Sequence, residues 1–511
     1  YCSITRLELE FLSSLNFGHF IITFGINAER FLDHGQDYPA FFQFFDEFED
    51  TRDPLSGSHL YFSGQYKTWS VKAGQHKRLS NDFVSASQGN GINKLDTQSR
   101  FYQLAYFHEL SDQVDVHLAL EEVNSQQSTV LVQLPANVAA GFWSNGAVVP
   151  FIGGNYRDVS SGRVTLDSTW RQNDNSQWQM GVEYRREENQ EITFQGNWDP
   201  DINRESNGFT FIPKSGPYTR ELWWFGNYQP LVPASERKVK SLYLQNKMQW
   251  HEQWQLTLEA RYDYYDDVGS NLSFRGGLVY QYSAFSAFKL LYGQAFRAPT
   301  LFELNALIAT GLIGNPDLAP ETVDTFDLVY LKDWGKAQMS LTYYHSRFDD
   351  VIETVAVEDI LSGFASFQPQ NVGSMDLSGW ELDLKAQLSS AFSVRISHAS
   401  ANEYVKLAAA DTLSSVSVNY VWENLNINLS GVFHAQVLSR QGSSAEEAIH
   451  LGNYWLIKVH ANYMLSPTLD LSLTVNNLFD EEYTSYNTAN GLERGTANRG
   501  RHWQLSLTQK F

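Results

Sequence analysis

Alternation of apolar and polar residues, in segments of about ten residues, constrains this chain more than any other feature. In the segment 254–264, WQLTLEARYDY, every second residue from Trp254 to Tyr264 is apolar and the residues between them are polar or charged. Side chains alternate across a strand, so one face of this segment is apolar and the other is charged. The same division recurs in 380–386, 394–396 and 471–476. The pattern predicts β-strands.

Alternation alone fits both a soluble sandwich and a membrane barrel, and the lengths of the connections separate the two. Short turns are expected at 251–253, 282–286, 332–336, 388–391, 422–424 and 464–468. Long connections lie near 186–239, 297–321, 348–377, 400–412, 434–452 and 484–500. Short turns at one rim and long loops at the other are typical of outer-membrane barrels. Further strands have room in 122–160 and 186–239.

We therefore predict an all-β fold, a transmembrane antiparallel β-barrel of about 22 strands, of which roughly 20 to 22 can be read. Its charged faces point into the lumen, because a cation on the lipid face costs about 2–4 kcal/mol at mid-bilayer. The short turns are periplasmic and the long loops extracellular.

Composition agrees with this prediction and excludes other classes. Aromatic residues make up 14% of the 511 residues, yet the chain has no run of 18 uninterrupted apolar residues, which disfavours membrane-spanning helices. The net charge of −21 argues against a nucleic-acid partner. The single cysteine, Cys2, excludes an intramolecular disulfide and a cysteine-built metal site. The chain starts at Tyr1 without a visible signal peptide, so we expect a processed chain or a fragment.

Several strings carry a resemblance to a known family. They are YLQNKMQWHEQWQLTLEARYDYYDDVGSN (243–271), KLLYGQAFRAPTLFELN (289–305), GNPDLAPET (314–322), NVGSMDLSGWELDLK (371–385), NNLFDEEY (476–483) and GRHWQLSLTQKF (500–511). In this order they resemble TonB-dependent outer-membrane receptors of the siderophore and cobalamin type. The residues that match the family boxes are Phe296, Arg297, Ala298, Pro299, Asn315, Pro316, Asp317, Leu318, Asn477, Leu478, Phe479 and Phe511. The resemblance is strong from Tyr243 onwards and weak near the start.

The family's architecture suggests how the chain is divided. Its members carry an N-terminal plug inside the barrel and a segment that engages the energy-coupling protein TonB. Residues 1–27 faintly resemble the last strands of such a plug, or they form the first barrel strand. Residues 28–511 are assigned to the barrel. By the resemblance, the plug is largely missing from this sequence.

The resemblance implies binding and energised, gated import of a ferric siderophore or a similar scarce chelate in the outer membrane of a Gram-negative bacterium. The alternatives are a cobalamin or saccharide receptor of the same family, and a plugless passive porin. We expect no enzyme, because no GxSxG, HExxH or Walker string is present. No cofactor and no resident metal are expected. The implied partners are the chelate, TonB, the lipid bilayer and the barrel-assembly machinery, with the barrel a monomer.

Ligand contacts are expected in the extracellular loops. The connection 186–239 carries Trp223, Trp224 and Tyr228 among cations that include Arg220 and Arg237, and such a set can grip a bulky anionic chelate. The alternative for the tryptophans is an aromatic girdle at the membrane interface. Arg297, Glu303 and Asn315 are further candidates. The alternative for these three is that their strings only shape a loop.

Two loops bear on the kind of cargo. Residues 300–314 contain no histidine, whereas haem receptors of the family carry a histidine ligand there, which disfavours haem. The acidic connection 348–361, with Asp349, Asp350, Glu353, Glu358 and Asp359, could chelate a cation. A solvated acidic loop is the more ordinary interpretation.

Overall fold

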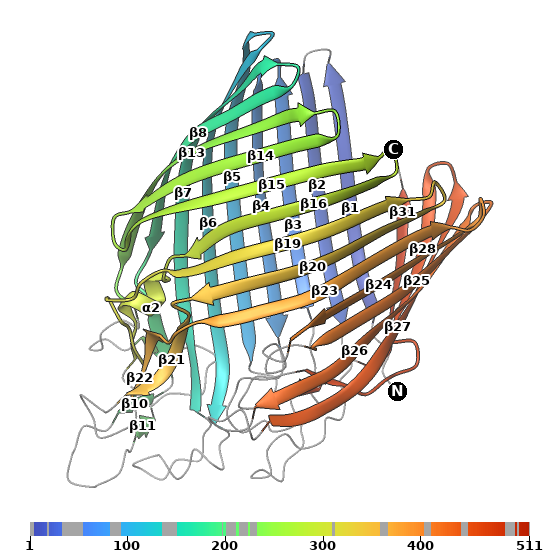
Figure 1. Cartoon of the computed structure of the whole chain (residues 1–511). Coiled ribbons are helices and arrows are strands. Elements are labelled where there is room, and N and C mark those ends of the chain that lie inside the picture. The colour runs from blue at the N-terminus through green and yellow to red at the C-terminus, as the bar shows by residue number, and fades with distance from the viewer. Residues whose placement is uncertain are drawn as a thin grey trace.

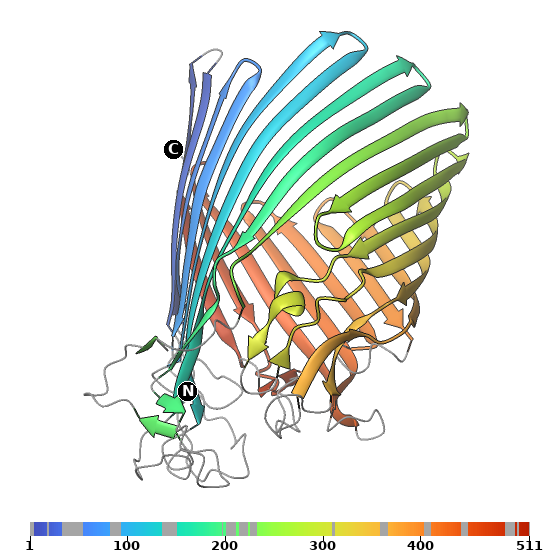
Figure 2. The same cartoon turned by 90° about the vertical axis from the view of Figure 1, so that its left-hand side faces the viewer.

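The computed structural model describes most of the chain, and nearly all of the described backbone is antiparallel strand. The described residues are 5–17, 20–32, 55–81, 93–134, 151–196, 198–200, 211–213, 223–224, 232–308, 312–357, 366–402, 410–440, 448–485, 496–497 and 500–509. Figures 1 and 2 show the long strands tilted and wound around a central space, with the shorter elements gathered at one end. Within these residues, no helix is both long and apolar enough to cross a membrane.

The wall of the barrel is one continuous ladder of neighbouring strands. In chain order these are β1 (Thr5–Phe17), β2 (Phe20–Leu32), β3 (Leu55–Tyr66), β4 (Trp69–Asn81), β5 (Lys94–Ser111), β6 (Val114–Leu134), β7 (Phe151–Asn173), β8 (Ser176–Asn189), β13 (Ser235–His251), β14 (Trp254–Tyr265), β15 (Gly269–Ser283), β16 (Ser286–Arg297), β19 (Glu321–Asp333), β20 (Ala337–Asp349), β23 (Met375–Gln387), β24 (Phe392–Ala401), β25 (Thr412–Trp422), β26 (Leu425–Arg440), β27 (Ala448–Ser466), β28 (Leu469–Asn476) and β31 (His502–Gln509). Each strand pairs antiparallel with the next in this series.

The main sheet of the described residues has 23 strands, and two of them are short: β9 (Thr193–Gly196) pairs with the first part of β7, and β12 (Trp223–Trp224) pairs with β9. Without these two, 21 strands form the wall. This lies within the predicted range, and the barrel prediction is confirmed. The strands β10 (Trp198–Pro200) and β11 (Phe211–Pro213) pair outside the main sheet, as do β29 (Thr484–Ser485) and β30 (Thr496–Ala497).

The six predicted short turns all separate paired neighbouring strands. The prediction for 434–452 was wrong in extent, because β26 continues to Arg440 and β27 already starts at Ala448. The stretch 122–160 likewise hides no further strand among its described residues, since β6 and β7 lengthen into it. In both places the ladder continues past the apolar band, where polar residues on both faces resemble a loop in the sequence.

The apolar faces point outward and the charged faces line the central space. Leu258 on β14 is 50% exposed on the outer surface, whereas Asp263 on the other face of the same strand is 3% exposed. Aromatic side chains meet across neighbouring strands on the outer face, with ring centroids 4.3 Å apart for Trp254 and Tyr280. Such cross-strand pairs stabilise a sheet. The predicted sense of the alternation is confirmed.

The two ends of the wall meet in an unusual seam. β1 and β31 run parallel, and in the described residues their register contains only the pairs Thr5–Trp503 and Arg6–Gln504. By contrast, β1 pairs with β2 along its whole length, from Thr5 to Phe17. Strand direction reverses at every step of an antiparallel ladder, so an odd number of wall strands brings the first and last together in parallel.

Candidate functional site: the loop-bearing mouth and the lumen

A short helix, α2 (Leu301–Asn305), follows β16 directly at the mouth of the barrel. Thr300 is its N-cap: the Thr300 hydroxyl accepts a hydrogen bond from the Glu303 backbone N–H at 3.1 Å, and the Glu303 carboxylate accepts one from the Thr300 N–H at 2.6 Å. This reciprocal arrangement is a capping box. The sequence interpretation treated this segment as a loop and missed the helix, although Thr300-Leu-Phe-Glu303 carries the capping signal.

Arg297, at the end of β16, connects this helix to two further strands. Its guanidinium donates to both carboxylate oxygens of Glu303, at 2.9 and 3.2 Å, and also to Glu321 at the start of β19. The second oxygen of Glu321 accepts from the backbone N–H of Ile352 at 2.6 Å, where β21 (Ile352–Val357) begins. Burial alone would raise the pKa of Glu303, but the hydrogen bonds from Arg297 and Thr300 outweigh it and hold that pKa below its ordinary value.

The segment after α2 is fastened to the neighbouring loop. β17 (Leu307–Ile308), β18 (Leu312–Ile313), β22 (Ser366–Asn371) and β21 form a small four-stranded sheet. Asn315 accepts a hydrogen bond from the Asp317 N–H and donates to the Pro369 carbonyl, each at 3.0 Å. Asn371 exchanges two hydrogen bonds with the backbone of Ala319, each at 3.0 Å. These contacts fix the conformation of the loop.

Arg237 on β13 is the most buried cation at the mouth among the described residues, at 4% exposed. It donates to Asp267 and to the Pro299 carbonyl, each at 2.7 Å. Its guanidinium also lies over the Tyr265 ring, 5.6 Å from the centroid. These contacts commit the charge and donors of Arg237 to the framework, and the expectation that Arg237 contacts a chelate stays a prediction.

The structure places the remaining candidates as follows. Trp223 and Trp224 lie on β12, which pairs with β9, and β9 pairs with the first part of β7. Arg220, Tyr228 and Phe511 lie outside the described residues. The contacts made by Arg297, Glu303 and Asn315 hold neighbouring loop segments together, which favours the loop-shaping alternative. A ligand role for all of these residues stays a prediction.

The other family-box residues also shape turns. Leu318 and Pro299 are buried, and Asn477 has a positive φ of 47°. The Asn477 side chain accepts from the Glu481 N–H and donates to the Glu481 carbonyl, each at 2.8 Å. A small polar side chain suits this left-handed backbone and closes the turn on itself. Ala298 adjoins Pro299, and Pro316 lies within the Asn315 turn. The backbone N–H of Leu478 donates to the Ile457 carbonyl, and the next side chain, Phe479, is exposed.

The acidic connection shows no chelating geometry in its described part. Asp349 accepts from the Arg347 guanidinium at 3.2 and 3.3 Å, and Asp350 adopts a left-handed turn with φ 56°. No group of three or more histidine, cysteine or acidic side chains suited to a metal occurs within the described ranges. Glu358 and Asp359 lie outside those ranges.

The lumen is lined by charged and hydroxyl groups bonded across strands. Glu121 on β6 accepts from Arg163 on β7 at 2.7 Å and from Gln103 on β5 at 2.6 Å. Tyr243 on β13 donates to Asp167 on β7 at 2.6 Å. A lumen of this kind is wet and too wide to be filled by its own side chains.

A tilted antiparallel wall with an apolar exterior, a charged lumen and long loops at one rim defines a transmembrane β-barrel of the outer-membrane type. The model of the TonB dependent receptor-like β-barrel family matches residues 23–478. The chain therefore belongs to this family and is a protein of the Gram-negative outer membrane.

Relatives of known name match this chain over only part of their own length. The chain is 24% identical over 341 residues to an iron-regulated outer membrane virulence protein of Vibrio cholerae, covering 59% of this chain and 50% of that protein. It is 24% identical over 254 residues to the vitamin B12 transporter BtuB of Photobacterium profundum, covering 47% and 39%. The chain thus spans about half, or less, of the length of these relatives.

Solved structures share the fold. A ferric enterobactin receptor of Pseudomonas aeruginosa superposes with a TM-score of 0.70 at 16% identity, covering 99% of this chain and 78% of that one. The siderophore receptor PirA of Acinetobacter baumannii gives a TM-score of 0.70 at 14% identity, covering 100% and 80%. Of these, the vitamin B12 relative is named as a transporter, and the two solved structures are named as receptors.

Proposed function

We propose that this barrel is the membrane part of a receptor that binds a ferric siderophore or a similar scarce chelate and imports it with energy delivered by TonB. The observation that carries the proposal is a wide, charge-lined barrel of the TonB-dependent receptor family, with hydrogen-bonded loop segments at its mouth. The relative in Vibrio cholerae, named as iron-regulated, supports an iron chelate as cargo. Binding and gated passage need no catalytic group, so we propose no enzymatic activity.

The proposal is tested in the intact protein by uptake of radiolabelled ferric chelates into iron-starved cells. Uptake should require the receptor and should stop when TonB is deleted. Receptor-dependent uptake that persists without TonB would instead indicate the passive porin. Current through a planar bilayer separates the same two cases, since a gated receptor is closed at rest.

A cobalamin receptor is the second candidate, because several named relatives are vitamin B12 transporters. Competition decides between the two. Excess cobalamin should leave binding of the ferric chelate unchanged. If cobalamin instead bound more tightly than any ferric chelate, the cobalamin receptor would become the favoured function.

We propose that Trp223, Trp224, Arg220 and Tyr228 contact the ligand from the connection between β8 and β13. The pairing of β12 with β9, which lies beside the first part of β7 at the loop-bearing rim, supports this. Replacing Trp223 and Trp224 by alanine should weaken chelate binding by about tenfold or more, the scale expected for buried aromatic contacts. Trp254→Ala, which removes an outward tryptophan at the other rim, is the control and should leave binding intact.

We further propose that residues 5–32 belong to the barrel and not to a plug, with the remaining chain up to residue 511 continuing that barrel. Their full antiparallel pairing with each other and with β3 supports this. The barrel-assembly machinery and the lipid bilayer are its proposed partners, and the barrel is proposed to be a monomer. Light scattering of the detergent-solubilised chain tests the last point.

A further inference from the structure

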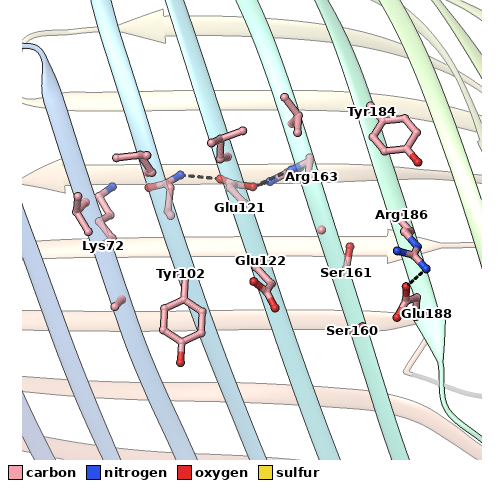
Figure 3. Close-up of a pocket in the computed structure, with 17 residues that line it drawn as sticks. Lys72, Tyr102, Glu121, Glu122, Ser160, Ser161, Arg163, Tyr184, Arg186 and Glu188 are labelled. Carbon is pink, nitrogen blue, oxygen red and sulfur yellow. Dashed lines mark hydrogen bonds and ion pairs between the residues drawn. The ribbon is translucent and has the colours of Figure 1, made fainter.

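A groove of about 630 Å³ lies on the wall formed by β4, β5, β6, β7 and β8. The floor of the groove follows β7, where the outward residues Ser160 and Gly162 form a strip of small side chains. Figure 3 shows Ser160 on this strand between the larger side chains of the neighbouring strands. Tyr102 and Glu122 stand on one side of the strip, and Tyr184, Arg186 and Glu188 stand on the other. The groove exists because β7 has small outward residues where its neighbours have large ones.

The groove opens on the outside of the barrel. Tyr102, Leu104, Leu120, Val164 and Tyr184 line it, and all five are among the large apolar side chains exposed on the outer surface. The register confirms that they share a face, because Leu104 pairs with Leu120, Leu120 with Val164, and Val164 with Tyr184. The lumen-facing Glu121 and Arg163 border it from the other side of the same backbone.

The groove straddles the edge of the apolar band. On β7 the outward residues change from Leu166 and Val164 to Gly162 and Ser160, and β8 changes from Val182 through Tyr184 to Arg186. From Trp170, near the short-turn rim, to Gly162 the wall rises about 20 Å, at about 3.3 Å per residue and a tilt of about 40°. An apolar band is about 25 Å tall, so this transition falls close to its outer edge.

Cations gather on the β8–β13 side of the groove. Arg186 and Lys238 are direct cross-strand partners, and Lys240 is the partner of Tyr184. Arg186 and Lys238 share Glu236, at 2.7 and 2.9 Å, and Arg186 also pairs with Glu188. Lys240 has no ion pair within the described residues.

Like charges placed opposite each other destabilise a sheet, and here Glu236 already bridges Arg186 and Lys238. The five charged groups on this side, Arg186, Glu188, Glu236, Lys238 and Lys240, carry one excess positive charge. Glu122, on the opposite side, disfavours an anion there. An anionic head group is therefore drawn to β8 and β13, while a hydrocarbon chain fits over Leu104, Leu120 and Val164.

We propose that this groove is a binding site for one phosphate-bearing lipid of the outer leaflet. Its phosphate contacts Lys240, Lys238 and Arg186, and one acyl chain lies along β7 over Gly162 and Val164. The site is independent of the cargo that the receptor imports. An amphiphile is the occupant because the groove is apolar in its inner half and charged in its outer half.

The test uses the full chain folded in detergent, with phosphatidic acid as the probe and phosphatidylcholine of the same acyl chains as its neutral counterpart. Native mass spectrometry counts the lipids that each barrel retains. We expect one retained phosphatidic acid, preferred by about tenfold, since each surface cation contributes about 1 kcal/mol to anionic lipid binding. Equal retention of the two lipids would overturn the proposal.

Two variants test the two halves separately. Gly162→Leu fills the strip, and the fold tolerates it because no atom lies within 4 Å of the added Cβ. It should abolish specific retention, whereas Gly276→Leu, which adds the same side chain on the outer face of β15, should not. Lys238→Gln with Lys240→Gln should remove the preference for phosphate, and Arg347→Gln on β20 should keep it.

If Gly162→Leu still retained one phosphatidic acid and preferred it over phosphatidylcholine, the groove would be overturned as the lipid site. If the double lysine variant kept its full preference for phosphatidic acid, the head-group contacts would be overturned. The lysine variant leaves the floor intact, so it remains decisive if Gly162→Leu folds poorly. Inorganic phosphate is the last arm. If free phosphate displaces the lipid as effectively as phosphatidic acid does, the acyl half of the site is refuted.

Discussion

The guanidinium of Arg297, at the end of β16, donates to both carboxylate oxygens of Glu303 on α2, at 2.9 and 3.2 Å. The same guanidinium binds Glu321, and Glu321 in turn holds the backbone of Ile352. One cation thus joins the end of β16, the helix α2, the start of β19 and the start of β21. The loops at the mouth form one bonded unit.

Replacing this cation should loosen that unit. Hydrogen bonds to charged groups contribute about 1.5–3 kcal/mol when buried, and solvent screening lowers the value at a partly exposed site, so Arg297→Gln should cost about 1–2 kcal/mol locally. Amide exchange across residues 301–305 should then be about tenfold faster. Arg347→Gln, which loses only the exposed pair with Asp349, is the control, and unchanged exchange in Arg297→Gln would contradict the bonded unit.

The same unit should weaken in acid. The pKa of Glu303 is lowered in the folded chain, so its stabilising effect is complete above the ordinary glutamate pKa of about 4.3 and is lost as the pH falls through the lower folded value. Protection of the α2 amides, corrected for intrinsic exchange, should therefore be flat at neutral pH and fall below about pH 4. Glu303→Gln should lower the neutral plateau and flatten the acidic fall; an identical pH profile would refute the assignment.

Gly181 on β8 should tolerate no side chain. An added Cβ would lie 2.4 Å from Asp167 Oδ1 and 2.5 Å from the Tyr243 ring, where these two residues are hydrogen bonded. Gly181→Ala should lower the free energy of unfolding by about 1–3 kcal/mol, as overpacking does. Gly162→Ala, with open space around its Cβ, should change it little. Thermal unfolding in detergent compares the two, and equal melting temperatures would count against the packing described.

The two faces of β14 should respond differently to a cation. Leu258→Arg places a charge on the lipid side near mid-bilayer, at a cost of about 2–4 kcal/mol. Thr257→Arg, one residue earlier, places it in the wet lumen and should be accepted. The fraction of heat-modifiable barrel on an unboiled gel reports folding, and equal folded fractions for the two variants would contradict the orientation of the wall.

The wall could be predicted from the sequence because its physics is local. In Trp254–Tyr264 each residue reveals its face by its polarity, and the bilayer enforces that rule along every strand. The capping box at Thr300 and Glu303 was also visible, but it was overlooked inside a string interpreted as a loop.

The mouth could not be predicted in the same way. The pairing of Asn371 with Ala319 and of Arg237 with Pro299 joins residues far apart in the sequence, and composition alone made Arg237 a ligand candidate. The groove over Gly162 was also missed, since it depends on which strands stand beside β7. Such contacts require the register of neighbouring strands, which alternation does not supply.

The parallel meeting of β1 and β31 means that the circumference is not uniformly strong. Elsewhere each strand is hydrogen bonded to its neighbour along most of its length. In hydrocarbon, no water is present to replace a broken backbone hydrogen bond. Here the described residues of β1 and β31 share only two registered pairs. Under mechanical force or in harsh detergent, the barrel should open first between β1 and β31. A cross-link between these two strands would therefore stabilise the barrel more than the same cross-link between any other pair of neighbouring strands.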